Sequence, residues 1–445
     1  MDKSELGQDV RLLRPIERTG RGFWIFTGIL LAIGAWGVFA WFNQLRRGLA
    51  VTGLNVPVYW GLYITNFVFF IGISHAGTLI SAILRLAHAE WRRSITRAAE
   101  VITVLVLFFG MACVILDLGR PDRVMNVIMH GNFSSPLLWD VCSVSLYLTA
   151  STIYLYLPLI PDIAILRDVL PRRQWLYRPL ALGWTGTPRQ HHLLERAISI
   201  MAIIVIPIAV SVHTVVSWVF AMTVQPMWHS TIFGPYFVVG AIFSGIAAIL
   251  LAMAIIRKAY HLEDYLKPIH FNNLGLLLLV FSLLWFYFTF AEFLTTYYGG
   301  EPMHMAVFLS KTEGKFSPLF WTMFVTCFAI PFPLLANRRT RGTIWGCVVA
   351  SLSVEVGMWL ERFLIVVPSL SNPRLPLTAA TYTPSWVEWS LFAAFVSIFM
   401  LLYAIFTKLF PIVSIWEIRE GRESSVKEVS TRVESYLPGP VESAS

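Results

Sequence analysis

Ten stretches of about 20 mostly apolar residues run through this chain, and they constrain its fold more than any other feature. A helix needs about 20 apolar residues to cross a hydrocarbon layer of roughly 30 Å, whereas a barrel strand needs only about ten that alternate. We therefore expect an all-α integral membrane protein with about ten transmembrane helices. The expected spans are 23–42, 58–83, 98–117, 137–160, 198–221, 232–256, 273–298, 318–336, 343–367 and 387–410.

Composition and charge agree with a membrane protein. With 56% hydrophobic and 13% charged residues, the chain is too apolar for a soluble protein of 445 residues. The termini and even-numbered loops carry 26 Lys and Arg residues, and the odd-numbered loops carry 7. Because positive charge is retained on the cytoplasmic side of a membrane, we expect both termini in the cytoplasm. The net charge of +8 then reflects orientation and contact with acidic lipid, and we expect no nucleic-acid partner.

Three matched pairs of short segments, about 180 residues apart, indicate an internal duplication: 61–63 with 234–236, 135–139 with 317–321, and 211–213 with 353–355. Their collinear order predicts two parallel four-helix bundles, a fold in which ligand sites form between facing helices. The expected organisation is a cytoplasmic N-terminal segment (1–22), the first span with an outer loop (23–57), a first bundle (58–221), a second bundle (222–367), an outer loop with the tenth span (368–410), and a polar cytoplasmic tail or docking strand (411–445).

Acids and bases within the apolar spans mark candidate sites, because an ionisable group at membrane depth is costly unless it has a role. Asp117 ends the third span and Asp140 opens the fourth, so both are expected at the outer mouth of the first bundle. His75 is expected roughly 25 Å along the second span, from the helical rise. In the second half of the chain, Ala248 stands at the position that matches His75, and Thr322 at the position that matches Asp140. Because only the first bundle has these ionisable side chains, we expect the substrate to bind there. The alternative role for Asp117 is a helix cap paired with Arg120.

A second group of ionisable residues is expected to move protons. His213 and Glu355 occupy equivalent places in the two halves, and imidazole titrates near neutrality. Glu361 and Arg362 are adjacent on the ninth span. Since adjacent residues do not face each other on a helix, we expect them to have different partners. For Arg362 these are a ligand oxygen, a lipid phosphate, or an acid such as Glu292 or Glu388. The structural alternative is a set of hydrogen bonds and ion pairs between helices.

The four cysteines lie in apolar spans without C-x-x-C spacing, so we expect no metal site, no iron-sulfur cluster and no attached haem c in this chain.

Four segments resemble one family of membrane subunits, the NrfD or polysulfide-reductase C family: 72–81 (GISHAGTLIS), 117–121 (DLGRP), 357–363 (GMWLERF) and 382–388 (YTPSWVE). The resemblance covers most of residues 20–415. Within the family the chain is most similar to the quinol-binding membrane component of bacterial alternative complex III. The sister membrane component of that complex, which is expected to conduct protons, shares these motifs and is the nearest alternative.

The resemblance implies a cofactor-free subunit of a respiratory chain in the bacterial cytoplasmic membrane, which oxidises quinol, such as menaquinol, near the outer face. Electrons would pass to an iron-sulfur subunit and then to multihaem cytochrome c subunits, beside a homologous membrane subunit. It implies that His75, Asp117, Asp140 and Arg362 form the quinol site, although some relatives have His at the position of Asp117. Proton translocation, with His213, Glu355 and Glu361 as relay, is the accompanying expectation. Quinol oxidation needs a nearby base, which the first three residues supply.

Two other functions fit parts of the pattern. A haem protein would use His75 and His213 as axial ligands, but two haems in a four-helix bundle would need four histidines. An ion-coupled secondary transporter would also have ten helices and buried charges, but its repeats are commonly inverted, and these are parallel.

Overall fold

The computed structural model describes residues 3–377 and 380–423, and these segments form long helices without a strand. Nine helical segments within them are long and apolar enough to cross a membrane: Arg21–Val51, Leu62–Leu86, Thr96–Asp117, Pro136–Val169, Pro188–Ala221, Phe233–Tyr260, Pro268–Gly299, Ser317–Ala336 and Trp386–Leu409. The expectation of an all-α multi-pass membrane protein is confirmed. The remaining expected span is α16 (Ile344–Ser371), a helix of 28 residues that carries three ionisable side chains.

Residues 62–221 supply one group of four packed helices. Its first helix is α3 (Leu62–His75), which continues through one π-helical turn, η3 (Ala76–Ile80), into α4 (Ser81–Leu86). The other three are α5 (Thr96–Asp117), α7 (Pro136–Val169) and α9 (Pro188–Ala221). Helix α3 packs on α5, α7 packs on α9, and α4 closes against α9. The interior of this group is mainly apolar, and its buried polar side chains are hydroxyls, two histidines, Asn66, Arg97, Glu100 and Asp162.

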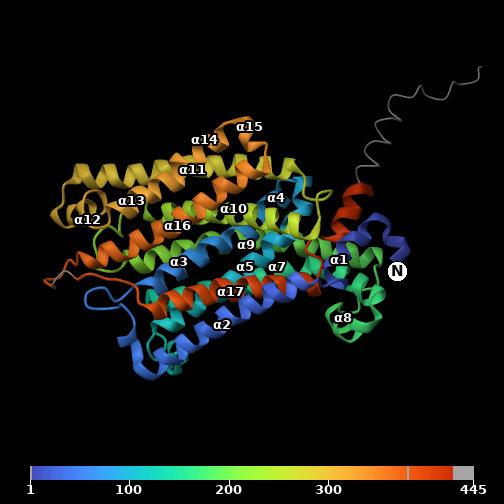
Figure 1. Cartoon of the computed structure of the whole chain (residues 1–445), viewed down its shortest axis with the longest axis horizontal. Coiled ribbons are helices and arrows are strands. Elements are labelled where there is room, and N and C mark those ends of the chain that lie inside the picture. The colour runs from blue at the N-terminus through green and yellow to red at the C-terminus, as the bar shows by residue number, and fades with distance from the viewer. Residues whose placement is uncertain (1–2, 378–379, 424–445) are drawn as a thin grey trace, which may run out of the picture.

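Residues 233–371 supply a second group. It contains α10 (Phe233–Tyr260), α11 (Pro268–Gly299), α16, and a broken helix made of α13 (Ser317–Phe324), the π-helical turn η7 (Val325–Ala329) and α14 (Pro331–Ala336). A short helix, α12 (Pro302–Thr312), lies at one end, opposite the chain termini (Figure 1). Both α10 and α16 pack on α3, so the two groups share a continuous core.

Two helices flank the groups as an antiparallel pair, α2 (Arg21–Arg47) and α17 (Trp386–Leu409) (Figure 1). Gly37 lets them approach closely, because a Cβ added there would overlap the Cβ of Ala394. Close backbone contact at small residues is a common way for membrane helices to associate. A hydrogen bond from Ser397 Oγ to the Leu30 carbonyl (2.7 Å) reinforces the pair. The shorter elements are η1 (Lys3–Leu13), α1 (Arg14–Glu17), η2 (Gly48–Val51), η4 (Glu90–Ser94), η5 (Pro121–Arg123), α6 (Asn126–Met129), η6 (Pro171–Arg173), α8 (Gln174–Leu180) and α15 (Arg338–Arg341).

The fourth and fifth spans are longer as helices than as apolar runs. Helix α7 continues to Val169, and α9 begins at Pro188, so the connection expected over 161–197 is largely helical. The start of α9 has a local cause: Thr187 Oγ1 accepts the Gln190 backbone N–H (3.3 Å) in a capping box, and Pro188 takes the first helical position. Caps of this kind lie outside the apolar run and set helix ends that hydropathy alone does not give.

Both described ends of the chain lie at the same end of the molecule, here named the terminal end (Figure 1); the opposite end, with α12, is named the far end. Asp9 joins them through an ion pair with Arg422 (3.0 Å). Part of the segment expected as a tail is packed on the bundle instead, because its apolar side chains, Ile412, Val413, Ile415 and Trp416, are buried. Residues 424–445 of the expected tail lie outside the described residues.

Candidate functional site

Two histidines meet in the interior of the first group of helices. His75 is the last residue of α3 and His213 lies in the second half of α9. Their ring centroids are 3.8 Å apart with an interplanar angle of 69°, and neither side chain is exposed. This contact joins residues 138 positions apart in the sequence, and the apolar pattern gave no sign of it.

The hydrogen bonds of the histidine pair are incomplete. His75 Nε2 lies 2.5 Å from the Ala209 carbonyl oxygen and its Nδ1 lies 3.2 Å from the Ile71 carbonyl oxygen. A neutral imidazole donates from one nitrogen only, so both carbonyls are satisfied only when the ring carries two protons. Both nitrogens of His213 are buried without a hydrogen-bond partner among the described residues. A buried polar group without a partner costs about 1–3 kcal/mol, so the His213 nitrogens are places where a water molecule or a ligand hydroxyl would bind.

The ring contact also bears on haem ligation. Two axial ligands stand on opposite sides of an iron atom with the macrocycle between them. Rings whose centroids are 3.8 Å apart leave no space for such a group. His75 and His213 in this arrangement therefore do not fit an axial pair.

Arg362 lies one helical turn from the histidine pair. A Cβ added at Gly240 of α10 would lie 2.7 Å from Arg362 Nη2, so the absence of a side chain there makes room for the guanidinium. A Cβ at Gly72, one turn before His75, would lie 3.9 Å from the same atom. The guanidinium also stacks over the Phe237 ring at 5.1 Å. Arg362 thus reaches from α16 across α10 towards α3.

The expectation that Glu361 and Arg362 have different partners is wrong. Arg362 Nη1 lies 3.0 Å from Glu361 Oε2, and both side chains are 1% exposed. The long arginine side chain bends back to its neighbour's carboxylate, although that contact is too bent to be a hydrogen bond. The acids expected as partners are engaged elsewhere: Glu292 accepts from Ser230 Oγ (2.5 Å), and Glu388 accepts from the Tyr382 hydroxyl.

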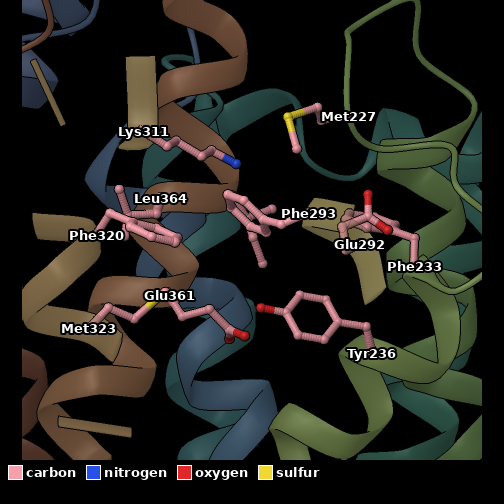
Figure 2. Close-up of a pocket in the computed structure, with 11 residues that line it drawn as sticks. Met227, Phe233, Tyr236, Glu292, Phe293, Lys311, Phe320, Met323, Glu361 and Leu364 are labelled. Carbon is pink, nitrogen blue, oxygen red and sulfur yellow. The ribbon is translucent and has the colours of Figure 1, made fainter. Parts of the chain in front are cut away.

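A narrow pocket of about 30 Å³, enough for about two water molecules, opens beside this ion pair, between α10, α11, α12, α13 and α16. Figure 2 shows the Glu361 carboxylate and the Tyr236 hydroxyl pointing towards one another at its base. Glu361 also accepts the indole N–H of Trp285 (2.7 Å), and Tyr236 accepts from Thr289 Oγ1 (3.3 Å). The pocket lies wholly in the second group of helices, whereas the sequence led us to expect the substrate in the first.

Lys311 of α12 points its ammonium group into this pocket (Figure 2). Its side chain is 7% exposed and makes no direct hydrogen bond or ion pair within the described residues. The Glu292 and Glu361 carboxylates line the same space, so the pocket holds both signs of charge. Polar groups around a narrow space of this kind suit ordered water, which bridges buried donors and acceptors.

Asp117 and Asp140 are not brought to the histidine pair. Asp117 lies near Tyr63, which is in the first turn of α3 and about 18 Å before His75 at the helical rise. Asp140 lies seven residues, or about 10 Å, before Tyr147, the α7 residue that packs on His75. Each aspartate has one buried carboxylate oxygen without a hydrogen-bond partner among the described residues.

The alternative role of Asp117 as a cap is not supported by its expected partner. Arg120 pairs instead with Asp122 (3.0 Å) at the surface.

Glu355 lies on α16, six residues before Glu361. Both of its carboxylate oxygens are buried without a hydrogen-bond partner among residues 3–377 and 380–423.

Similarity to a known protein family covers most of the helices described above. Residues 50–373 match the family described as polysulphide reductase, NrfD. The chain belongs to the NrfD polysulphide reductase family. That match covers both groups of helices and the candidate residues from His75 to Arg362.

Several relatives within or near this family carry informative names. A putative membrane subunit of dimethyl sulfoxide reductase from Halobacterium salinarum is 30% identical over 52% of this chain and 51% of the relative, so that match spans about half of either protein. A selenate reductase subunit from Mesobacillus selenatarsenatis is 25% identical over 87% of this chain and 94% of the relative. An Hdr-like menaquinol oxidoreductase integral membrane subunit of Archaeoglobus fulgidus is 23% identical over 90% and 96%.

Sequence reasoning missed several polar residues of this NrfD-family interior. Lys311 counted only as a loop charge, because the short helix α12 is not part of a 20-residue apolar run. Glu100 and Tyr147 lie within expected spans. Glu100 is three residues before Thr103, and Tyr147 is four and seven residues before Ser151 and Tyr154, so helical spacing could have placed these polar side chains on shared faces. Among the described residues, no group of three or more His, Cys, Asp or Glu side chains is arranged to hold a metal ion.

Proposed function

We propose that this chain is the quinol-binding membrane subunit of an electron-transfer complex, most similar to the quinol-binding membrane component of bacterial alternative complex III. It oxidises menaquinol near the far end and passes two electrons to an iron-sulfur partner subunit, and then to multihaem cytochrome c subunits. The observation that carries the proposal is the unsatisfied histidine pair beside Arg362 inside an NrfD-family bundle. The name of the Archaeoglobus relative supports menaquinol as the substrate class.

Each candidate residue has a chemical role in this proposal. Oxidation of a quinol releases two protons and two electrons, so bases must lie near its hydroxyl groups. Asp117 and Asp140 at the far end each have a free carboxylate oxygen to accept a proton. His75 holds a proton deeper in the bundle, and Arg362 stabilises negative charge near it. The acids thus act at the mouth, and the imidazole acts in the interior.

The proton-relay part of the proposal uses His213, Glu355 and Glu361. The unpartnered ring of His213 contacts His75, and Glu361 lies between Arg362 and the pocket of Figure 2. Water in that pocket would connect Glu361 with Lys311 and Glu292 towards the far end. The excess of Lys and Arg at the termini supports placing the terminal end in the cytoplasm, so that the far end faces outwards.

The alternatives within the NrfD family are the sister proton-conducting component of the same complex and the membrane anchor of another reductase. Both would share the fold and the partner homologous membrane subunit, and they would differ in whether this chain itself binds quinol.

The test is to replace His75 with Ala and Asp140 with Asn in the assembled complex. We expect quinol-dependent reduction of the partner haems to fall by about 100-fold, the loss expected when a positioned proton acceptor is removed. The exposed residues His88 and Asp264, changed in the same way, serve as controls and should leave turnover unchanged. Wild-type turnover in both His75→Ala and Asp140→Asn would overturn the assignment of the site.

A further inference from the structure

Hydroxyl-bearing residues lie in a line between the histidine pair and the terminal end of the first group of helices. Ser74, Thr78 and Ser81 follow one face of α3, η3 and α4, and Tyr147, Ser151 and Tyr154 follow one face of α7. The two rows run in the same direction and stay in register, because the three bonded pairs are each separated by 73 residues. The pairs are Tyr147 Oη to the Ser74 carbonyl (3.1 Å), Thr78 Oγ1 to Ser151 Oγ (3.2 Å) and Ser81 Oγ with Tyr154 Oη (3.4 Å).

A third helix, α5, bonds to the same row of residues. Thr103 of α5 donates to the Ser74 carbonyl (2.6 Å) and accepts the Thr78 backbone N–H (3.1 Å). Gly77 permits this approach, since a Cβ there would overlap the Ala99 carbonyl and the Thr103 hydroxyl. The π-helical turn η3 lies at this point, and such turns are frequent at functional sites.

The line ends at opposite poles on two titratable side chains. At the end of the line in the middle of the bundle, the Tyr147 ring packs on His75, with centroids 5.3 Å apart. At its terminal pole Ser81 Oγ donates to Glu100 Oε1 (2.6 Å), and this is the hydrogen bond that the described residues offer the Glu100 carboxyl. Glu100 is 4% exposed. The charged and titratable groups nearest to it come from every neighbouring element: Arg85 of α4, Arg97 of α5, Tyr154 of α7 and Glu417 of the C-terminal segment.

The terminal pole is covered by the packed C-terminal segment. Asp162 of α7 accepts the backbone N–H groups of Ile415 (3.1 Å) and Trp416 (3.0 Å) and pairs with Arg97. Glu417 pairs with Arg85 and, at 3.3 Å, with Arg92. These groups lie between Glu100 and the surface of the terminal end.

Hydroxyls between helices also serve as plain packing contacts. Packing alone does not require a carboxyl at one pole, an imidazole at the other and three bonded pairs in constant register between them. The bonds run across between α7 and the α3–α4 helix, and successive pairs are about 5 Å apart along the helices. A proton therefore moves from one pair to the next by rotation of a hydroxyl or through a bridging water, and a hydroxyl that accepts one proton and releases its own is left unchanged.

We infer that Glu100 is the group through which the histidine pair exchanges protons with the terminal end, along the hydroxyl line from Ser81 to Tyr147. This inference rests on the proposed function and deepens it by naming the proton route. One proton moves from Glu100 towards His75 for each proton that the pair releases, and Glu100 is then protonated again from the terminal end. No electron moves in this exchange.

The experiment uses the whole complex in vesicles, supplied with a short-chain quinol. Proton uptake at the terminal end is followed with a pH-sensitive dye, and electron transfer is followed by reduction of the partner haems. We expect Glu100→Gln, which preserves the shape and the bond with Ser81, to slow this proton uptake by about 100-fold. Ser151→Ala removes one member of the line and should act in the same direction. Thr152→Ala is the matched control, because the neighbouring hydroxyl is exposed and bonds back to the Leu148 carbonyl (2.7 Å).

A second measurement tests Glu100 directly. Infrared difference spectra between the oxidised and reduced complex should contain a protonated carboxylic acid band that shifts in D₂O and is lost in Glu100→Gln. Wild-type proton uptake together with an unchanged spectrum in that variant would overturn the inference while leaving the proposed function intact. A wild-type complex that transfers no electrons from quinol would instead overturn the proposed function, and the inference with it.

Discussion

The two groups of helices have similar scaffolds and different polar interiors. In the first group, neutral hydroxyls stand in register between Glu100 and His75, and the terminal end is closed by ion pairs. In the second, charged side chains surround a pocket at the far end, with Lys311 and Glu361 facing the same space (Figure 2). The two groups thus differ in their polar interiors and in which helix carries a π-helical turn, η3 in the first group and η7 in the second.

The largest expected effect concerns the closed end of the first group. Asp162→Ala removes the partner of Arg97 and the acceptor of two backbone N–H groups, leaving a buried cation unpaired. We expect the free energy of unfolding to fall by about 3–5 kcal/mol. Thermal unfolding in detergent measures this change. Asp168→Ala, which breaks an ion pair with Arg167 on the same helix near the surface, should cost about 1 kcal/mol or less. Equal losses in both variants would mean that the closed end adds no stability.

The next effect tests the charged interior of the second group. Glu361→Gln leaves Arg362 without its ion pair while retaining an acceptor for Trp285. We expect quinol turnover to fall by about 100-fold if this carboxylate passes protons to the pocket. Stopped-flow reduction of the partner haems measures it. A variant with normal turnover and lowered thermal stability would show that the Glu361 carboxylate has only a structural role.

A smaller effect is expected at the pocket mouth. Lys311→Met keeps the length of the side chain and removes the charge that faces the two carboxylates. We expect turnover to fall by about tenfold, which corresponds to about 1.4 kcal/mol. Lys315→Met is the control, since that ammonium group lies over the Phe316 ring and is not part of the pocket. If both substitutions slow turnover equally, a general charge effect at the far end explains the result better than the pocket does.

The smallest effect is on the docking of the C-terminal segment and depends on pH. Burial alone would raise the pKa of Glu417, but Arg85, Arg92 and Arg97 hold that pKa below its usual value. Because the pKa is lowered in the folded state, the stabilisation is complete above the ordinary glutamate value of about 4.3 and is lost as the pH falls through the lower folded value. Hydrogen exchange of residues 415–417 should therefore stay slow at neutral pH and increase only in acid. Glu417→Gln should remove this acid dependence.

The fold was largely predictable from the apolar runs. For example, the run 232–256 corresponds to α10, Phe233–Tyr260. Helix ends were less predictable, since the start of α9 depends on the Thr187 cap and not on hydropathy.

The site was predictable as a set of residues but not as a geometry. His75 and His213 were candidates because both lie within apolar spans. Their contact could not be predicted, because it depends on how closely α3 and α9 approach each other. The error at Glu361 and Arg362 has a similar cause. Helical spacing gives the directions of the Cα–Cβ bonds of Glu361 and Arg362, which diverge. The arginine side chain is long enough to bend back to the Glu361 carboxylate, in the space that Gly240 leaves open. Lys311 was missed because its short helix folds back at the far end.

The packed segment at 411–417 bears on how the protein is made. Chains are synthesised from the N-terminus, so the backbone groups that bond to Asp162 and the Glu417 carboxylate that pairs with Arg85 reach the bundle only after α17 has been made. The terminal end of the first group is therefore closed late in synthesis, and we expect a truncation before Ser414 to leave Arg97 and Asp162 in contact with water.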